Sequence, residues 1–324
     1  MSDIWLQFLL TIDATFRVAT PLILCAMAGI FSEKSGIIDI SLEGKMLMAA
    51  FAAAAVASLT HSPWAGMLAA IGISVSLGLL HGLASITLRG NQVISGLAIN
   101  ILASGLTVTI GIAIFQQGGQ TPNLARDERF RPVELPLVDW IDHIPLLGRI
   151  YREVISGHNI LVWTALAAVV ITALVLTRTR FGLRLRAVGE KPEALDSAGV
   201  SVAKTRYQAL IIAGVLCGIA GAYLSTAHGS GFVREMTAGK GYIALAAMIF
   251  GKWQPRGALL ACLLFGFLEA MASRLQGVSL PLIGEVPVDL VLALPYLLTV
   301  ILLAGFVGKA MPPRAIGEPY IKER

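Results

Sequence analysis

The sequence predicts an all-α membrane protein that crosses the bilayer many times. Three observations point to this class: 56% of the 324 residues are hydrophobic, only 14% are charged, and long apolar runs recur along the chain. Water-soluble chains carry about 25% charged residues, and about 20 apolar residues cross the ~30 Å core of a bilayer. Spans and connections take up nearly all of the chain, so we expect a single transmembrane domain over residues 1–324 and no separate catalytic domain.

About nine transmembrane helices, within a range of eight to ten, are expected from the apolar runs. The predicted spans are residues 14–31, 42–60, 64–87, 92–115, 159–177, 207–226, 241–253, 257–276 and 289–307. Residues 4–12 are expected to form at most a short interfacial helix ahead of the first span.

Glycines predict how some of these helices pack. The span 241–253 is too short to cross upright at 1.5 Å per residue, and Gly239, Gly241 and Gly251 bracket its apolar part. It is either a broken helix beside a central substrate site or a helix whose glycines only allow close packing. Close packing is the preferred interpretation for two further pairs, which are Gly78 with Gly82 and Gly214 with Gly218.

Lysine and arginine residues predict which ends of the spans face the cytoplasm. They cluster in residues 178–206 and in the tail after residue 308, and basic loops are typically cytoplasmic. Four apolar segments lie between these two regions, an even number that returns the chain to the same side. The loop 116–158 and the N-terminus are then extracytoplasmic. That loop also carries arginines, so an additional N-terminal span remains an alternative.

The three cysteines, Cys25, Cys217 and Cys262, each lie inside an apolar segment. We expect them to be small buried hydrophobic residues, because their spacing matches neither a disulfide framework nor a metal site. The formal net charge of +5 follows from the cytoplasmic basic loops, and it therefore predicts no nucleic-acid partner.

Charged residues stand unusually close to the second span, in the stretch GIIDISLEGKMLMAA at residues 36–50. Asp39 or Ser41 can cap a helix that begins near Leu42. Asp39 and Glu43 are four residues apart and would share a helical face, and ionisable groups at membrane depth are candidates for function. Two interpretations stay open: a role in a pathway or gate, or groups that are solvated or paired at the cytoplasmic surface.

The sequence lacks the motifs of several enzyme classes. It contains no Gly-x-x-x-x-Gly-Lys-Ser/Thr phosphate loop, no His-Glu-x-x-His and no Gly-x-Ser-x-Gly. Without them, ATP hydrolysis by a phosphate loop and intramembrane hydrolysis are not expected of this chain.

Four stretches resemble the membrane permease subunits of bacterial ABC importers. They are SGIIDISLEGKMLMAA, GNQVISGLAINILASGLT, RAVGEKPEALDSAGVSVAKTRYQALIIAGVLCGIAGAYLS and GKGYIALAAMIFGKWQP. The similarity covers roughly residues 14–308 and is to the branch of nucleoside and simple-sugar permeases, with branched-chain amino acid and ribose permeases more distant. That branch commonly has Asn-Ile-Gly-Leu-Glu-Gly where residues 39–44 read Asp-Ile-Ser-Leu-Glu-Gly, so the choice between nucleoside and simple sugar stays open.

The resemblance implies a multi-pass permease subunit, itself not an enzyme and without a cofactor, in the bacterial inner membrane. ATP and Mg²⁺ would be bound by a partner ABC ATPase. The other implied partners are a second permease, identical or homologous, and an extracytoplasmic substrate-binding protein.

The resemblance also implies a short cytoplasmic coupling helix that contacts the ATPase, within the loop 178–206. Pro192 suits a first helical turn and Gly199 a helix end, while Ala194 and Ala198 would give a face of small residues. An ordinary surface helix is the alternative. The predicted coupling residues are Gly189, Glu190, Pro192, Glu193, Ala194, Ala198 and Gly199.

Neutral amides and hydroxyls inside the spans suit a substrate that carries hydroxyls or a nucleobase. The candidate pathway or gate residues are Asp39, Ser41, Glu43, Gly44, Asn91, Gln92, Ser95 and Asn100. Asn91 could instead cap its helix, and Asn100 could bond a neighbouring helix. Glu269 could pair with Arg274 or face a subunit interface.

Two rival functions follow from the same sequence. An ion-coupled secondary transporter would need ionisable residues in its spans, and Glu269 is the main candidate. A membrane scaffold or sensor is the other rival, although neither terminus carries an output module.

Overall fold

The computed structural model describes residues 2–133, 151–152, 156–275, 279–280, 284–285, 293, 297 and 311–322. Among these residues, seven helices are long and apolar enough to cross a membrane, so the chain is an all-α multi-pass membrane protein. These seven candidate spanning helices are α1 (Ser2–Lys34), α2 (Leu42–Thr60), α3 (Pro63–Gly82) with the π-helical turn η1 (Leu83–Thr87), α4 (Gln92–Phe115), α7 (Ile160–Arg178), α10 (Val202–Tyr223) with the π-helical turn η3 (Leu224–His228), and α12 (Pro255–Leu275).

Three shorter helices and a small hairpin complete the described chain. They are α8 (Arg180–Glu190), α9 (Pro192–Ser197), α11 (Lys240–Phe250), β1 (Ser279–Leu280) and β2 (Gly284–Glu285), the two strands being antiparallel. α11 has only 11 residues, as expected for the short span at 241–253. The predicted span 289–307 lies outside the described residues, apart from residues 293 and 297.

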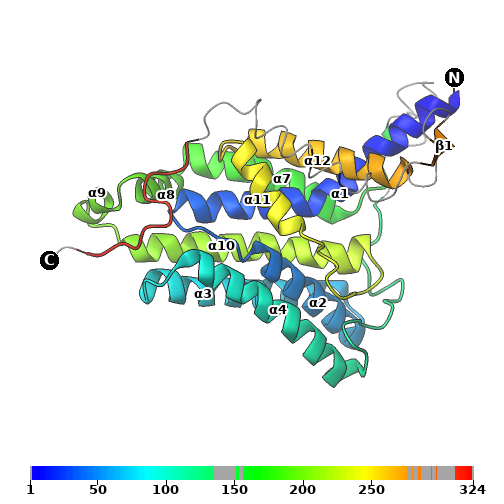
Figure 1. Cartoon of the computed structure of the whole chain (residues 1–324), viewed down its shortest axis with the longest axis horizontal. Coiled ribbons are helices and arrows are strands. Elements are labelled where there is room, and N and C mark those ends of the chain that lie inside the picture. The colour runs from blue at the N-terminus through cyan, green and yellow to red at the C-terminus, as the bar shows by residue number, and fades with distance from the viewer. Residues whose placement is uncertain are drawn as a thin grey trace.

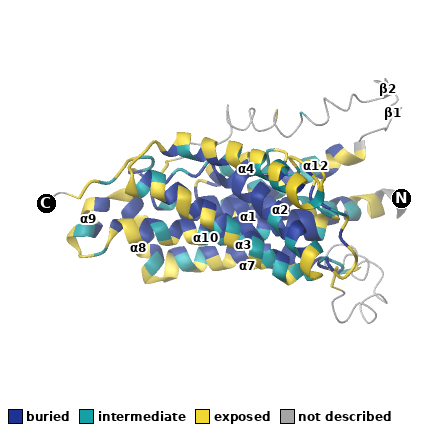
Figure 2. Ribbon diagram, turned by 90° about the horizontal axis from the view of Figure 1, so that it is seen from below, coloured by how far each residue is buried: buried dark blue, intermediate teal, exposed yellow. Residues whose placement is uncertain are grey.

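The helices form an inner group and an outer group. α1, α2 and α10 lie mostly buried in the middle of the bundle, while α3, α4, α7 and α12 leave much of their surface exposed, as Figures 1 and 2 show. α10 packs against α3, α1 and α2, and α1 also packs against α12, α11 and α7. Exposed apolar faces on the outer helices suit contact with lipid.

The glycine pairs bring α3 and α10 together, as predicted. A Cβ at Gly214 would lie 2.7 Å from the Cα of Val75, and a Cβ at Gly218 would lie 2.6 Å from the Cα of Ile71. Such contacts are too close for any side chain, so glycine allows the two backbones to touch.

The first helix is longer than the sequence suggested. The expectation of a short interfacial helix before residue 14 is wrong, because α1 is continuous from Ser2 to Lys34. The polar side chains of its first half are satisfied within the helix: Thr15 Oγ1 donates to the carbonyl of Thr11, and Arg17 Nη2 lies 2.8 Å from Asp13 Oδ2. Pairs four residues apart stabilise a helix, and α1 continues without a break into its apolar second half.

The three cysteines are buried and free, as expected. Cys25 Sγ lies 3.7 Å from Cys217 Sγ, where it packs in the core between α1 and α10.

The two ends of the bundle carry different segments. α8, α9 and the C-terminal tail (residues 311–322) lie at one end, and the N-terminus lies at the other, as Figure 1 shows. The basic segment and the tail therefore share an end, in agreement with the assignment of both to the cytoplasmic side.

Candidate functional site

The segment between α1 and α2 runs into the bundle along α4. The backbone N–H of Ile38 donates to Gln92 Oε1 at 2.7 Å, and the N–H of Gly44 donates to Asn100 Oδ1 at 2.8 Å. Asn100 lies eight residues after Gln92, which corresponds to about 12 Å along a helix. The start of α2 is therefore recessed from the cytoplasmic end of α4.

Asp39 and Lys45 form an ion pair inside the protein. Lys45 Nζ lies 2.6 Å from Asp39 Oδ2, and neither side chain is exposed. Ser41 Oγ donates to the other carboxylate oxygen at 2.5 Å. The pair and the serine hydroxyl together satisfy a charge that would be costly to bury alone.

The predicted capping role of Asp39 and Ser41 is wrong. Ser41 occupies the N-cap position of α2 but makes no capping hydrogen bond with its side chain. Asp39 instead pairs with Lys45, and Ser41 donates to Asp39. An unpaired buried ammonium costs more than a helix start without a side-chain cap.

Gln92 of α4 bonds the same segment directly, and Ser95 of α4 bonds His81 of α3, which in turn bonds the segment. His81 Nε2 donates to the carbonyl of Ile38 at 2.9 Å, and His81 Nδ1 lies 3.1 Å from Ser95 Oγ. Asn91 serves as the cap of α4, since its Oδ1 accepts from the N–H groups of Val93 and Ile94. Gln92 and Asn91 therefore bond backbone at this end, whereas Ser95 bonds the ring of His81.

Glu43 connects the start of α2 to the start of α11. Its Oε1 accepts from the N–H of Gly239 at 2.9 Å, and its Oε2 accepts from the N–H of Gly241 at 2.6 Å. The carboxylate, which belongs to the first turn of α2, thus compensates the partial positive charge at the N-terminus of α11. The expectation that Asp39 and Glu43 share a helical face is wrong, because Asp39 precedes α2 and bonds Lys45.

Asn100 completes this contact from α4. Its Nδ2 donates to the carbonyl of Ile40 at 3.1 Å and to the hydroxyl of Tyr242 at 2.8 Å. Gly44 is required here, since a Cβ would lie 2.7 Å from the Cα of Asn100. We call the meeting point of Glu43, Gly44, Asn100, Gly241 and Tyr242 the helix junction.

Tyr242 is the residue of the helix junction that the sequence reasoning missed. It lies in the first turn of α11 and 43% of its surface is exposed. A phenol is apolar along the ring and polar at the tip. Its place next to Gly241 at the start of an unusually short apolar segment is the signal that could have identified it.

The predicted coupling residues form the connection between α8 and α10. α9 begins at Pro192, Glu193 lies in its first turn, and Gly199 has φ +76°, a conformation that favours glycine. Ala194 and Ala198 are exposed, as is Glu190 at the end of α8.

Gly189 lies against the end of α1. A Cβ at this position would lie 2.3 Å from the carbonyl oxygen of Lys34, and the carbonyl of Gly189 accepts from the N–H of Ala315. α8, α1 and the tail are therefore joined at one point.

Glu269 pairs with Lys240, and the predicted pair with Arg274 is wrong. Arg274 Nη1 donates instead to the carbonyl of Gln7 at 2.9 Å. No group of three or more histidine, cysteine or acidic residues is placed to hold a metal ion among the residues that the structure describes.

Comparison with known proteins identifies the family of this chain. The family model described as "Branched-chain amino acid transport system / permease component" matches residues 11–303. The guanosine ABC transporter permease protein NupQ of Bacillus subtilis is 39% identical over 317 residues, which cover 96% of each chain. The nucleoside ABC transporter permease protein NupC of Lactococcus lactis is 38% identical over 94% of this chain and 95% of its own.

A more distant relative comes from one of the same bacteria. The guanosine ABC transporter permease protein NupP of Bacillus subtilis is 26% identical over 87% of this chain and 79% of its own. All three relatives are ABC permeases, so an ion-coupled secondary transporter is not supported.

Proposed function

The chain belongs to the family of the branched-chain amino acid transport permease component, and from this premise we propose that it is the non-catalytic permease subunit of a bacterial importer for nucleosides. The structural observation that carries the proposal is the helix junction, where α2, α4 and α11 bring polar groups together well inside the bundle. Nucleoside permeases at 38–39% identity support the choice of substrate.

The helix junction offers neutral groups to a passing molecule. Both carboxylate oxygens of Glu43 already accept hydrogen bonds from backbone N–H groups, so neither lacks a donor. The amide of Asn100 and the phenol of Tyr242 remain partly exposed. A phenol ring can contact a nucleobase, and an amide can exchange hydrogen bonds with a base or ribose. Hydrogen bonds with the neutral groups of Asn100 and Tyr242 would hold the substrate without an ion pair, which suits passage.

Energy would come from a partner ABC ATPase that contacts the coupling residues. α9 leads directly into α10, and α10 packs against α2, whose first turn belongs to the helix junction. A displacement of α9 would therefore be passed through α10 to the substrate pathway. An extracytoplasmic substrate-binding protein would deliver the nucleoside at the opposite end.

The second permease of the complex is proposed to be homologous and not identical. Two guanosine permease proteins of one bacterium resemble this chain, one at 39% and the other at 26% identity. This chain resembles one of these two proteins much more closely than the other. This difference supports a complex in which two different permease subunits pair, with this chain as one of them.

The test is uptake of radiolabelled guanosine by the complete complex in proteoliposomes. Uptake should require ATP and should stop when the partner ATPase carries a catalytically dead site, since this chain would hydrolyse no ATP. Excess unlabelled adenosine should compete and excess arabinose should not. Uptake driven by an ion gradient alone, or competition by the sugar alone, would contradict the proposal.

A further inference from the structure

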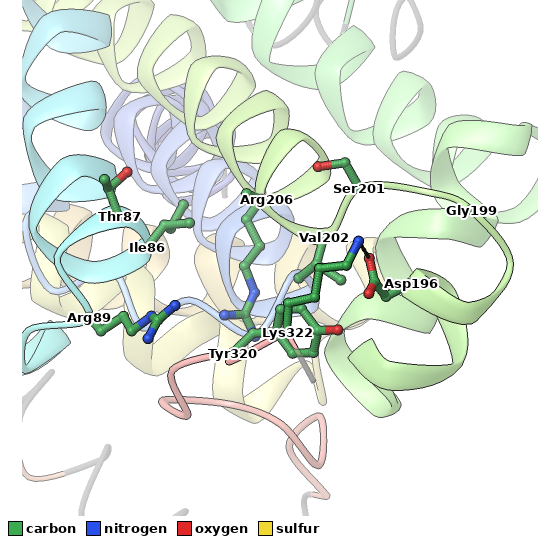
Figure 3. A pocket seen from close by; sticks show the side chains of 11 residues that line it. Ile86, Thr87, Arg89, Asp196, Gly199, Ser201, Val202, Arg206, Tyr320 and Lys322 are labelled. Carbon is green, nitrogen blue, oxygen red and sulfur yellow. Dashed lines mark ion pairs between the residues drawn. The ribbon is translucent and has the colours of Figure 1, made fainter. Parts of the chain in front are cut away.

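A cavity of about 360 Å³ opens at the cytoplasmic end of the bundle, apart from the helix junction. Three cationic side chains from three different elements line it: Arg89 from the α3–α4 connection, Arg206 from α10, and Lys322 from the tail. Figure 3 shows the guanidinium groups of Arg89 and Arg206 turned toward one another, with Lys322 on the opposite side extended toward Asp196.

The tail is fastened in place and forms one wall of the cavity. The N–H of Ala315 donates to the carbonyl of Gly189 at 2.8 Å, and the N–H of Gly317 donates to the carbonyl of Gly36 at 3.0 Å. Lys322 Nζ lies 3.5 Å from Asp196 Oδ1. The tail is therefore bonded to α8 and to the segment that follows α1.

Arg206 supplies a buried charge at the floor of the cavity. It is 1% exposed, its Nε donates to the carbonyl of Ser35, and its Nη1 donates to the carbonyl of Glu318. Its Nη2 has no hydrogen-bond partner among the described residues. Carbonyl groups satisfy hydrogen bonds but do not neutralise the charge. Among the described residues Arg206 makes no direct ion pair, and the carboxylate of Glu193 on α9 attracts it only from a longer distance.

The balance of charge in the cavity favours an anion. The only carboxylate among its described lining residues belongs to Asp196, which already faces Lys322. The other two lining cations, Arg89 and Arg206, make no ion pair with an acid among the described residues. The first turn of α10 also lines the cavity, with Val202 and Ala203, and the start of a 22-residue helix adds partial positive charge.

We propose that this cavity binds a phosphate group, either of an anionic lipid headgroup or of a soluble phosphate compound. Several oxygens on one phosphate can accept hydrogen bonds from an arginine and from backbone N–H groups at the same time. The bound group would link the α3–α4 connection, the loop after α9 and the tail. It would thereby restrain the segment proposed to receive the ATPase, a regulatory property that does not depend on the transported substrate.

The first arm of the test uses a soluble probe. Thermal unfolding of the detergent-solubilised full-length chain is measured against inorganic pyrophosphate, with sodium chloride at matched ionic strength. Pyrophosphate should raise the melting temperature, and the double variant Arg89→Gln/Lys322→Gln should bind about tenfold or more weakly, because charge-assisted hydrogen bonds are lost. The matched control is Arg180→Gln/Arg184→Gln, which removes two exposed cations from α8 and should respond like the unmodified chain.

The second arm uses lipid. The same proteins are placed in nanodiscs of phosphatidylcholine with or without phosphatidylglycerol. Stabilisation by phosphatidylglycerol alone, lost in the Arg89→Gln/Lys322→Gln variant, identifies the source as a lipid headgroup. Stabilisation by pyrophosphate with no effect of phosphatidylglycerol identifies a soluble source.

Arg89→Gln alone keeps the test valid if the double variant misfolds, because the ion pair of Lys322 with Asp196 is left intact. The proposal is overturned if neither probe separates the cavity variants from the α8 control. It is also overturned if the cavity variants lose only affinity for the ATPase, since the cavity would then receive an acidic side chain of that protein. Unfolding is measured without transport, so a wrong transport assignment leaves this result unaffected.

Discussion

Asp39 and Lys45 show how a membrane protein holds two full charges in its interior. Their side chains are both fully buried and lie 2.6 Å apart, and Ser41 bonds the carboxylate as well. Removing one partner would leave the other charge without compensation. Each charge therefore needs the other in order to stay buried, but the intact pair is weak evidence for a gain in the free energy of unfolding.

Lys45→Met should destabilise the protein by about 3–5 kcal/mol, because the carboxylate of Asp39 is left buried and unpaired. Asp39→Asn/Lys45→Met should recover much of that loss, since it removes both charges. The measurement is chemical unfolding of the single and double variants in detergent as a double-mutant cycle. Additive losses would show that the two side chains are independent.

Tyr242 and Asn100 form the polar contact of the helix junction that is open to its surroundings. Tyr242→Phe removes only a hydroxyl, and with it the hydrogen bond to Asn100 Nδ2. If the pair contacts the substrate, the KM for guanosine uptake should rise about fivefold, equivalent to one hydrogen bond of roughly 1 kcal/mol, with the folded fraction unchanged.

Tyr207→Phe is the matched control for that prediction. Its hydroxyl lies 2.6 Å from Thr87 Oγ1 at the cytoplasmic end, away from the helix junction, so the same chemical change should leave the KM unaltered. Equal effects of the two substitutions would remove Tyr242 from the pathway.

At the scale of elements, the central feature is the contact between two helix starts inside the bundle. α2 begins about 12 Å from the end of α4, and α11 is held at its first residues by Glu43. Two N–H groups at the start of α11 donate to one carboxylate of α2, and these hydrogen bonds attach α11 to α2. α11 is consequently held at its N-terminus. Its position depends on how closely the backbone of Gly241 approaches the backbone of Glu43.

Gly241→Ala should displace α11 and abolish most uptake. A Cβ at this position would lie 2.6 Å from both the Cα and the N of Glu43, and these backbone atoms have no room to move. Gly105→Ala in α4 is the control, because its Cβ would meet no atom within 4 Å. Uptake and surface expression of both variants check the prediction; full uptake by Gly241→Ala would mean that the contact is not needed for transport.

At the scale of the whole molecule, the two ends of the bundle are joined by α10. α10 follows α9 at the cytoplasmic end and packs against α1, α2 and α3 along its length. A contact at α9 can therefore influence the position of α2. This arrangement suits a subunit that receives mechanical work at one end and transmits it to a pathway within the membrane.

Glu193→Lys/Ala194→Arg should leave the permease inserted in the membrane but unable to bind its ATPase. Both residues are exposed on α9, and bulky basic side chains would replace a small residue and an acid. Co-purification of the ATPase with the permease measures the effect. Gly118→Arg, an exposed position in the 116–133 loop, should retain the ATPase. Undiminished co-purification with the α9 variant would contradict the coupling assignment.

The sequence predicted those parts of the molecule that depend on local composition. Hydrophobic runs located α2, α3, α4, α7 and α12 within a few residues, because crossing a bilayer requires an apolar stretch of fixed length. Pro192 and Gly199 located α9, and the capping role of Asn91 was one of two uses considered for it. The family was also recognisable, since its motifs are contiguous stretches.

The sequence did not predict how the candidate residues are used, because their partners lie far away along the chain. Glu43 bonds Gly241 across 198 positions, and Asn100 bonds Tyr242 across 142. Lys45 is close to Asp39 in sequence, but their pairing requires Asp39 to lie outside α2, which begins only at Leu42. Periodicity assumes a continuous helix, so it placed Asp39 and Glu43 on one face.

The sequence by itself determined a multi-pass membrane protein with basic segments on one side, since hydropathy and charge act residue by residue during insertion. Its contiguous motifs also indicated the permease family by resemblance. Only the tertiary structure decided that α2 begins inside the bundle, that Glu43 holds α11, and that Tyr242 joins Asn100. The physical reason is that a buried charge or amide must find a partner wherever packing brings one, and packing brings together residues that the sequence keeps far apart.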